Sequence, residues 1–296
     1  MCGLCGFTGE IVDRDAVLEN MTEVITHRGP DSKGVYTDDK ISMGFRRLSI
    51  IDLDNGSQPI YNEDKTLVLM FNGEIYNYKQ LRKELQEKGH VFATDTDSEV
   101  LVHGFEEWRE DLLNRLRGMF GFAIWNRTDE SLFIARDFFG IKPMHYTQVG
   151  GHFLYASEIK SILKFPGFEK KFNYRTLDNY LSFQYAVPPE TFFEGVYCLL
   201  PGHYLWYRDG KAETTRYWEA RFNPDESLTE EQAVDEIEKV FEESVNAHKI
   251  SDVEVGCFLS SGVDSSYVST YFADQKTFTV GFDFGEKYNE ISWAER

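Results

Sequence analysis

Cysteine is scarce in this chain of 296 residues, which holds only four, at positions 2, 5, 198 and 257. That small and dispersed set excludes a disulfide framework, and it fits a reducing compartment such as the cytoplasm. No second pair of Cys or His follows Cys2 and Cys5 at the spacing typical of zinc sites, so the sequence assigns no metal site. Cys198 and Cys257 lie in apolar surroundings and are expected in the core.

Positive charge and long apolar runs are also lacking. The chain has 31 basic and 50 acidic residues, a formal net charge of −19, which argues against nonspecific binding to nucleic acid or to an anionic membrane. No apolar run reaches the roughly 18 residues of a membrane span, and the amino terminus lacks the segments of a signal peptide. We expect a cytoplasmic protein of about two domains, with small polar molecules as partners.

Short strands with few helices are expected up to residue 210. Short apolar segments separated by turn residues predict strands at 3–9, 41–45, 66–71, 120–125, 131–136 and 152–156. Helical periodicity predicts helices at 15–26, 78–88, 98–108 and 158–163. This mixture predicts sheets covered by helices for a first domain at 1–210.

The character of the chain changes after residue 210. An acidic linker at 219–227 leads into a predicted amphipathic helix at 229–249 and an apolar strand at 253–259. A helix beginning near Ser265 and a strand at 277–281 follow. This order predicts the beginning of an α/β domain at 211–296.

Cys2 directly follows Met1, so removal of the methionine would place a thiol and a free α-amine on one residue. A thiol attacks carbonyl groups well, and an α-amino group titrates at about 7.7 to 8.0, where a general base works well. Cys2 is therefore a candidate nucleophile. On this residue alone, the alternative of an incidental residue at a frayed terminus stays open.

Four polar clusters follow in the first domain, at 27–31, 45–50, 71–74 and 94–97. Each has a purely structural interpretation: a helix stop, a solvated arginine, an Asn72-Gly73 turn at the end of a strand, and a helix N-cap at Asp97. The functional alternative is that the Asn72 side chain and the Gly73 N–H point at an oxyanion. Asp97 would then also face a ligand amine.

These clusters resemble the N-terminal-nucleophile glutaminase domain of the class II glutamine amidotransferases. The resemblance rests on motifs in the expected order, namely Cys2-Gly3-x-x-Gly6, His27 to Asp31, Arg47-Leu48-Ser49, Asn72-Gly73-Glu74 and Asp97. The stretches at 135–143 and 156–161 also resemble that family. The resemblance implies an α+β fold, a four-layer αββα sandwich.

The resemblance also implies a role for each motif. Cys2 would attack the side-chain amide of glutamine, and Asn72 with Gly73 would stabilise the tetrahedral oxyanion. Arg47 would hold the substrate α-carboxylate and Asp97 the α-amino group. The remaining residues of the pocket would be Leu48, Ser49, Ile50, Ile51 and Glu74.

A second motif is the small-residue loop Phe258-Leu259-Ser260-Ser261-Gly262-Val263-Asp264-Ser265-Ser266. Backbone N–H groups in such a loop can bind phosphate at a helix N-terminus, although an ordinary serine-rich turn is the alternative. The loop resembles the pyrophosphate-binding loop of ATP pyrophosphatases, usually Ser-Gly-Gly-x-Asp-Ser, with Ser261 in place of the first glycine. The resemblance implies an adenine nucleotide alpha-hydrolase-like domain that binds ATP through Phe258, Ser260, Ser261, Gly262, Asp264, Ser265 and Val280.

Together the two motifs resemble the asparagine synthetase family, which implies aspartate and ATP as further substrates and Mg²⁺ to offset the triphosphate charge. The second domain of that family is several times longer than residues 211–296, so glutamine hydrolysis alone is expected of this chain. Two alternatives stay open: another amide-forming ATP pyrophosphatase, and a non-catalytic module that binds glutamine. The sequence leaves the oligomeric state open, a homodimer included.

Overall fold

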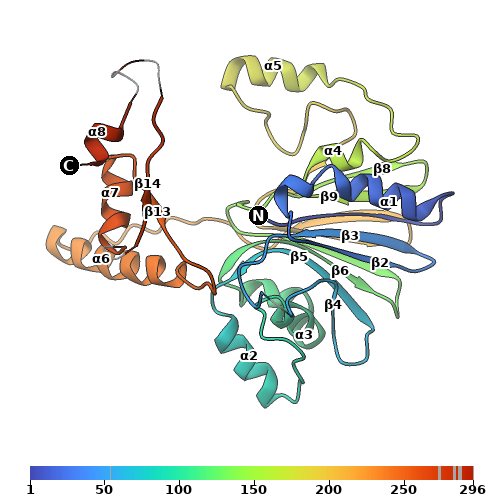
Figure 1. Cartoon of the computed structure of the whole chain (residues 1–296), viewed down its shortest axis with the longest axis horizontal. Coiled ribbons are helices and arrows are strands. Elements are labelled where there is room, and N and C mark those ends of the chain that lie inside the picture. Colours follow the sequence, from blue (N-terminus) through green and yellow to red (C-terminus); the bar gives the residue numbers. More distant parts are fainter. Residues whose placement is uncertain (54, 273–274, 283–284, 286–288, 296) are drawn as a thin grey trace. The chain divides into compact units, whose positions relative to one another are not determined.

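The computed structural model describes residues 1–53, 55–272, 275–282, 285 and 289–295. They form two compact units, Met1–Arg221 and Phe222–Arg296 (Figure 1). The boundary expected after residue 210 falls inside a hairpin, because β11 (His203–Arg208) pairs with β12 (Lys211–Arg216). The first unit therefore extends past this hairpin. None of the helices in the described ranges is long and apolar enough to cross a membrane.

Two six-stranded antiparallel sheets form the centre of the first unit, with strand orders β10-β8-β9-β1-β3-β2 and β12-β11-β7-β6-β5-β4. The first sheet consists of β1 (Gly3–Thr8), β2 (Ser32–Thr37), β3 (Ile41–Arg47), β8 (His145–Val149), β9 (His152–Ala156) and β10 (Tyr197–Cys198). The second adds β4 (Ile60–Tyr61), β5 (Leu67–Ile75), β6 (Gly118–Asn126) and β7 (Ser131–Arg136) to β11 and β12.

Helices cover the outer faces of the two sheets, which makes four layers (Figure 1). On the first sheet, α1 (Arg14–Glu23) and α4 (Ile159–Ile162) pack over Cys5 and Phe7. On the second, α3 (Glu99–Trp108) packs through Phe105 against Phe133, with ring centroids 4.9 Å apart, and α2 (Tyr78–Glu87) contacts α3. The α+β sandwich with αββα layers is thus confirmed. The unit also contains α5 (Tyr174–Phe183) and the short 3₁₀ helices Thr26–Arg28 and Arg109–Asn114.

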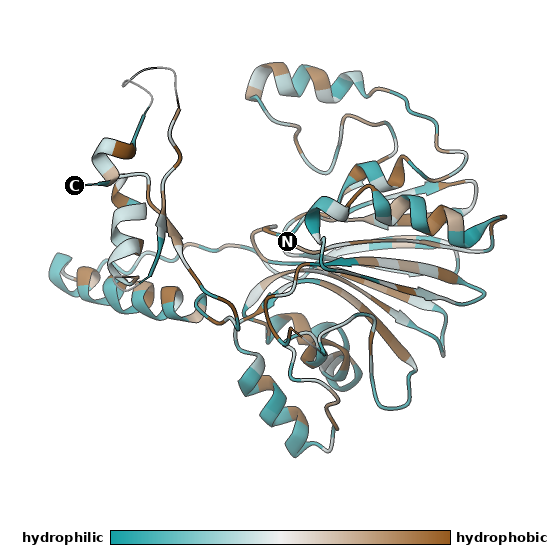
Figure 2. Ribbon diagram, viewed as in Figure 1, coloured by the Kyte–Doolittle hydropathy of each residue, from teal (hydrophilic) through white to brown (hydrophobic). Residues whose placement is uncertain are grey.

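The core between the two sheets explains how distant residues meet. Leu4 of β1 and Met70 of β5 are fully buried in it. Side chains two positions apart on a strand share a face, so Cys2 continues the inward face of β1 and Asn72 continues that of β5. Cys2 packs partly buried against this core. Figure 2 shows the hydrophobic residues along both sheets and the hydrophilic ones on much of α2.

The second unit begins with α6 (Glu230–Ala247), whose N-terminus is closed by a capping box between Thr229 and Gln232. Two short parallel strands follow, β13 (Cys257–Phe258) and β14 (Thr277–Phe278), with α7 (Val263–Thr270) between them and α8 (Ile291–Ala294) after them. The predicted strands at 253–259 and 277–281 are too long, because β13 and β14 pair over two residues only. A small core of Val245, Cys257 and Phe272 joins these elements.

Candidate active site

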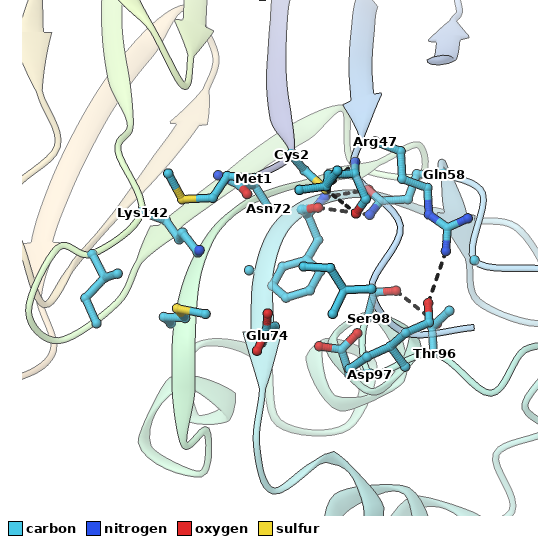
Figure 3. A pocket seen from close by; sticks show the side chains of 18 residues that line it. Met1, Cys2, Arg47, Gln58, Asn72, Glu74, Thr96, Asp97, Ser98 and Lys142 are labelled. Carbon is cyan, nitrogen blue, oxygen red and sulfur yellow. Dashed lines mark hydrogen bonds between the residues drawn. The ribbon is translucent and has the colours of Figure 1, made fainter. Parts of the chain in front are cut away.

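A cavity of about 340 Å³ lies where β1, β3 and β5 come together, and Figure 3 shows the side chains that line it. The residues expected for a glutaminase site line it with one exception: Cys2, Arg47, Leu48, Ile50, Ile51, Asn72, Gly73, Glu74 and Asp97. The exception is Ser49, whose backbone N–H donates to Asp31 Oδ2 at 2.8 Å. Ser49 therefore anchors the loop that carries the lining residues.

Cys2 places its thiol at the mouth of this cavity. The Sγ atom accepts a hydrogen bond from the Leu48 N–H at 3.3 Å and lies 3.5 Å from the Leu48 carbonyl oxygen, to which the thiol donates. Burial raises the pKa of the Cys2 thiol above its ordinary value, although the Leu48 N–H and the amino terminus oppose the rise. The thiol is therefore protonated at neutral pH, and attack on a carbonyl requires a base beside it. Burial lowers the pKa of the Met1 amino group, which lies beside the thiol.

Within the polar cluster at 27–31, Arg28 has a structural role beside Cys2. Its Nε donates to the Cys2 carbonyl oxygen at 2.8 Å, and its Nη1 donates to Glu158 Oε1 at 3.0 Å. Burial alone would raise the pKa of Glu158, but hydrogen bonds from Lys160, Arg28 and His27 outweigh it and lower the pKa to about 2. Glu158 is thus ionised at every working pH, and it holds the guanidinium that fixes the Cys2 backbone.

Asn72 carries a polar group without a partner. The interpretation of Asn72-Gly73 as a turn that ends the strand is wrong, because β5 runs on to Ile75 and pairs with β6 throughout. Asn72 is 1% exposed, and its Nδ2 has no hydrogen-bond partner among the described residues. A buried unsatisfied donor costs about 1 to 3 kcal/mol of folding free energy. An oxygen atom of a ligand in the cavity would satisfy it.

The Gly73 N–H points to the same side of β5 as the cavity. The Phe71 N–H donates to Gln58 Oε1 at 2.7 Å and the Ile75 N–H donates to Asp97 Oδ2 at 2.8 Å, so both point away from β6. In an antiparallel strand these directions alternate from residue to residue. Gly73, midway between the two, therefore directs its N–H to this open edge, next to the Asn72 amide.

Arg47 is buried and binds the loop that follows β3. Its Nη1 donates to the Leu53 carbonyl oxygen at 3.1 Å, and its Nη2 donates to those of Ile51 at 3.1 Å and Asp52 at 2.6 Å. A guanidinium has five N–H groups. Two of them make no hydrogen bond to the described residues and remain for an anion in the cavity.

Asp97 brings the opposite charge. It is 6% exposed and lies just before α3. Burial raises the pKa of its carboxyl to about 7, against the effect of the Ile75 N–H and with a further contribution from Glu74. A cation beside Asp97 would restore its ionised form. With Arg47, the cavity can therefore hold both charged groups of an α-amino acid.

The expected nucleotide loop lies in the second unit, before α7. Ser261 has φ +60°, the left-handed region that glycine adopts without strain, so the substitution for glycine keeps the conformation at a cost. Ser260 Oγ and Ser265 Oγ lie 3.0 Å apart, and the Ser260 N–H donates to Ser265 Oγ at 3.2 Å. Phe258 and Val280 are 76% and 61% exposed. The loop thus leaves the N-terminal turn of α7, which contains Asp264, open to an anion.

Comparison with known proteins matches this geometry to a family. The glutamine amidotransferase domain family matches residues 1–218, and the asparagine synthase family matches residues 236–296. The chain belongs to the glutamine amidotransferase family. Asparagine synthetase [glutamine-hydrolyzing] 1 of Bacillus subtilis (strain 168) is 41% identical over 305 residues, which cover 99% of this chain and 48% of that relative.

Asparagine synthetase [glutamine-hydrolyzing] 2 of the same organism is 38% identical over 300 residues, which cover 95% of this chain and 40% of that relative. This amidotransferase thus spans about half the length of the curated relatives it matches. The solved structure of glutamine phosphoribosylpyrophosphate amidotransferase from B. subtilis, complexed with ADP and GMP, superposes with a TM-score of 0.55. At 17% identity, over 97% of this chain and 68% of that one, it shows a shared fold only.

Sequence reasoning missed part of the site of this amidotransferase, including Gln58, Thr96, Ser98, Met119, Ile141 and Lys142. Lys142 is 4% exposed; burial lowers its pKa, and the charges of Glu74 and Cys2 oppose that effect. Lys142 lies in Gly140-x-Lys142-Pro143, a stretch that resembles the family but that by itself predicts no role for the lysine. Thr96 and Ile141 also lie in stretches that the sequence singles out, at 94–97 and 135–143, whereas Gln58, Ser98 and Met119 reach the cavity through tertiary contacts that no local pattern marks.

Proposed function

We propose that the first unit hydrolyses glutamine to glutamate and ammonia, with Cys2 as the nucleophile. The observation that carries this proposal is the cavity into which both the Cys2 thiol and the unpartnered Asn72 amide open. Two charged side chains in its wall supply what the α-carbon groups of glutamine need: Arg47 for the α-carboxylate and Asp97 for the α-ammonium. Leu48, Ile50, Ile51 and Glu74 complete the wall.

The proposed reaction follows from these positions. After removal of Met1, the α-amine of Cys2 takes the thiol proton, and the sulfur forms a bond to the amide carbon of glutamine. The oxygen then carries the negative charge and accepts hydrogen bonds from Asn72 Nδ2 and the Gly73 N–H. The α-ammonium returns its proton to the leaving nitrogen, the C–N bond breaks and ammonia departs. Water adds to the thioester, and the C–S bond breaks to release glutamate.

Alkylation with a glutamine-mimicking diazoketone, followed by intact mass and peptide mapping, tests this function. We expect loss of Met1 and a single adduct on Cys2, with protection by excess glutamine. The buried Cys5 and Cys257 are the internal controls, because they are equally thiols but do not line the cavity. Retained Met1, or an adduct that glutamine does not prevent, would contradict the proposal.

A weakened Arg28 contact should slow turnover. Arg28→Met removes the hydrogen bond to the Cys2 carbonyl oxygen, and a displacement of about 1 Å of a reacting group can cost roughly 100-fold in rate. We expect kcat for glutamate release to fall by about tenfold to 100-fold, with little change in KM. Arg46→Met is the matched control, since Arg46 lies beside Arg47 but pairs with Glu23 on the surface. Equal kcat in the two variants would argue against a positioning role for Arg28.

Glutamine binding should depend on pH through Asp97. Its pKa is raised to about 7 in the free protein, so below that pH the carboxyl is neutral and the ammonium of glutamine lacks its counter-charge. In a Cys2→Ala background, calorimetry should show the Kd falling as pH rises from about 5.5 to 7.5 and levelling above, with proton release on binding. Asp97→Asn should bind weakly and without this pH dependence. Asp95→Asn, at a position whose side chain is 92% exposed, should behave like the parent; a pH-independent parent would refute the assignment.

For the second unit we propose a part in asparagine synthesis, with ATP bound at the loop of Phe258, Ser260, Ser261, Gly262, Asp264, Ser265 and Val280. The support is the match of residues 236–296 to the asparagine synthase family and the open N-terminal turn of α7. The Ser260 and Ser265 hydroxyls are oxygen ligands of the kind Mg²⁺ accepts, but they bond to each other. We therefore assign no protein ligand to Mg²⁺, which would arrive with ATP. Aspartate is the proposed acceptor, and ATP binding is the assay, because glutamine hydrolysis alone is expected of this chain.

We also propose that this activity takes place in the cytoplasm. All four cysteines are free, which favours the cytoplasm. A homodimer stays a proposal that light scattering of the purified chain would test.

A further inference from the structure

Four side chains that the proposed glutamine chemistry does not use converge beside α3. Glu63 follows β4, His90 follows α2, and His103 and Glu106 lie one turn apart on α3. One nitrogen or oxygen atom from each of these residues lies within 4.8 Å of those of the other three. The sequence alone does not predict this group, because its members are spread over more than forty positions and only His103 and Glu106 lie one helical turn apart.

His103 is the most constrained member. It is 1% exposed, and its Nε2 lies 3.3 Å from Glu99 Oε1, within hydrogen-bond distance. The Glu99 carboxylate is itself held by the backbone N–H groups of Ala93 and Thr94, both at 2.7 Å. The opposite ring nitrogen, Nδ1, is buried 3.2 Å from Glu63 Oε2, yet it makes no hydrogen bond to the described residues.

This arrangement leaves the buried Nδ1 atom of His103 without a hydrogen bond to the described residues. If Nε2 carries the ring proton toward Glu99, then Nδ1 presents a lone pair to the carboxylate oxygens of Glu63, and the two repel each other. A cation between them would convert the repulsion into two attractive contacts. A carboxylate on the far nitrogen of a ligating histidine is the usual way in which proteins fix the ring and raise its basicity.

The spacing suits a small transition-metal ion. His90 Nδ1 lies 3.2 Å from Glu63 Oε1 and 4.0 Å from Glu106 Oε2. In tetrahedral zinc sites, bonds of about 2.0 to 2.2 Å place the ligand atoms about 3.3 to 3.6 Å apart. Small rotations of two partly exposed glutamates would therefore complete such a site. The Glu63 and Glu106 side chains are 36% and 40% exposed, which provides a path of entry.

We propose that this cluster binds one divalent cation of the zinc class, through Glu63, His90 Nδ1, His103 Nδ1 and Glu106. Two carboxylates balance the charge of the ion, and four protein ligands make the site closed and structural. The outer contacts are already in place, since the Val91 N–H donates to Glu63 at 2.8 Å and Asn62 Nδ2 donates to Glu106 at 3.2 Å.

The bound ion would tie the turn after β4 to the segment between α2 and α3. Glu99 bridges from His103 to Thr94, and the same segment continues through Thr96 and Asp97 into the wall of the cavity. The site therefore stabilises the support of that wall. This inference is independent of the proposed glutamine chemistry.

Zinc titration of the full chain tests the proposal. The Cys2→Ala background removes the partly exposed thiol at the cavity, and calorimetry with metal analysis should give one zinc ion per chain. Glu106→Gln should weaken zinc affinity by at least tenfold, while Glu107→Gln, the neighbouring glutamate that pairs with Lys88 instead, should bind zinc like its background. His90→Gln gives a second, less buried variant in case His103→Gln does not fold.

Cobalt substitution identifies the ligands. A tetrahedral Co²⁺ spectrum without the intense near-ultraviolet band of thiolate ligation would support the cluster, and zinc should raise the thermal midpoint by a few degrees in the parent but not in Glu106→Gln. Absence of zinc binding, equal affinity in Glu106→Gln and Glu107→Gln, or a thiolate band would overturn the proposal. The four side chains would then form a cluster that packs beside α3 without a metal ion.

Discussion

Replacement of Cys2 by alanine is expected to abolish glutamine hydrolysis, with kcat reduced by about four orders of magnitude or more, as when a catalytic nucleophile is deleted in other hydrolases. The reason is geometric and chemical. No other thiol lines the cavity in the described part of the chain, so the bond to the amide carbon cannot form from another sulfur. A coupled assay of glutamate release measures the effect.

The controls separate lost chemistry from lost structure. Cys198→Ala removes a half-buried thiol on the first sheet that contacts Arg136 of the second sheet, and it should leave kcat within a few-fold of the parent. Cys2→Ala should still bind glutamine, because Arg47, Asp97 and the wall of the cavity are unchanged. Glutamate release by Cys2→Ala at an appreciable fraction of the parent rate would remove the nucleophile assignment.

Asn72→Ala is expected to lower kcat by about two to three orders of magnitude while KM changes little. The Asn72 amide is an unpartnered donor in the free protein, so its main hydrogen bond forms when charge develops on the substrate oxygen. Removal of one such donor in a characterised protease has an effect of this size. Steady-state kinetics of glutamate release checks the split between kcat and KM. A raised KM with an unchanged kcat would instead mean that Asn72 only binds the ground state.

Gly73 on β5 and Gly121 on β6 can be compared to test the second proposed oxyanion donor, the Gly73 N–H. A Cβ atom at Gly73 would lie 2.1 Å from the Met119 carbonyl oxygen, so Gly73→Ala must displace β5 from β6 and with it the Gly73 N–H. A Cβ at Gly121, opposite Asn72 in the same ladder, would meet its nearest atoms at 3.5 Å. We expect Gly73→Ala to lose most activity and Gly121→Ala to keep it.

Much of the fold follows from local patterns. Short apolar segments between turn residues predict β7 and β9 with their observed bounds, and helical periodicity predicts α2 and α6 to within a few residues. Those patterns depend only on which face of each element is apolar. The strands in the second unit were predicted too long because a strand extends only as far as its partner, and pairing partners are not visible in the strand itself.

The sequence predicts several residues of the site but not their local conformation. Motif order that resembles a known family predicts four site residues, Cys2, Arg47, Asn72 and Asp97. The cavity brings them together. The Asn72-Gly73 pair taken alone also left open the alternative of a turn, where the structure has a continuous strand whose open edge carries the Gly73 N–H. Asn72 and Gly73 favour a turn locally, but the hydrogen bonds of the full ladder between β5 and β6 outweigh that preference.

By itself, the amino-acid sequence predicted sheets covered by helices, and through its resemblance to a family it predicted a nucleophilic thiol at Cys2 and charged partners for an amino acid, because these motifs depend on residue type and on order along the chain. Tertiary structure alone decided that Arg28 holds the Cys2 backbone, that Lys142 lies in the cavity wall, and that Glu63 and His103 meet beside α3. Each of these contacts joins segments far apart in the sequence. Their distances are set by the packing of two sheets and their covering helices, and no local pattern encodes that packing.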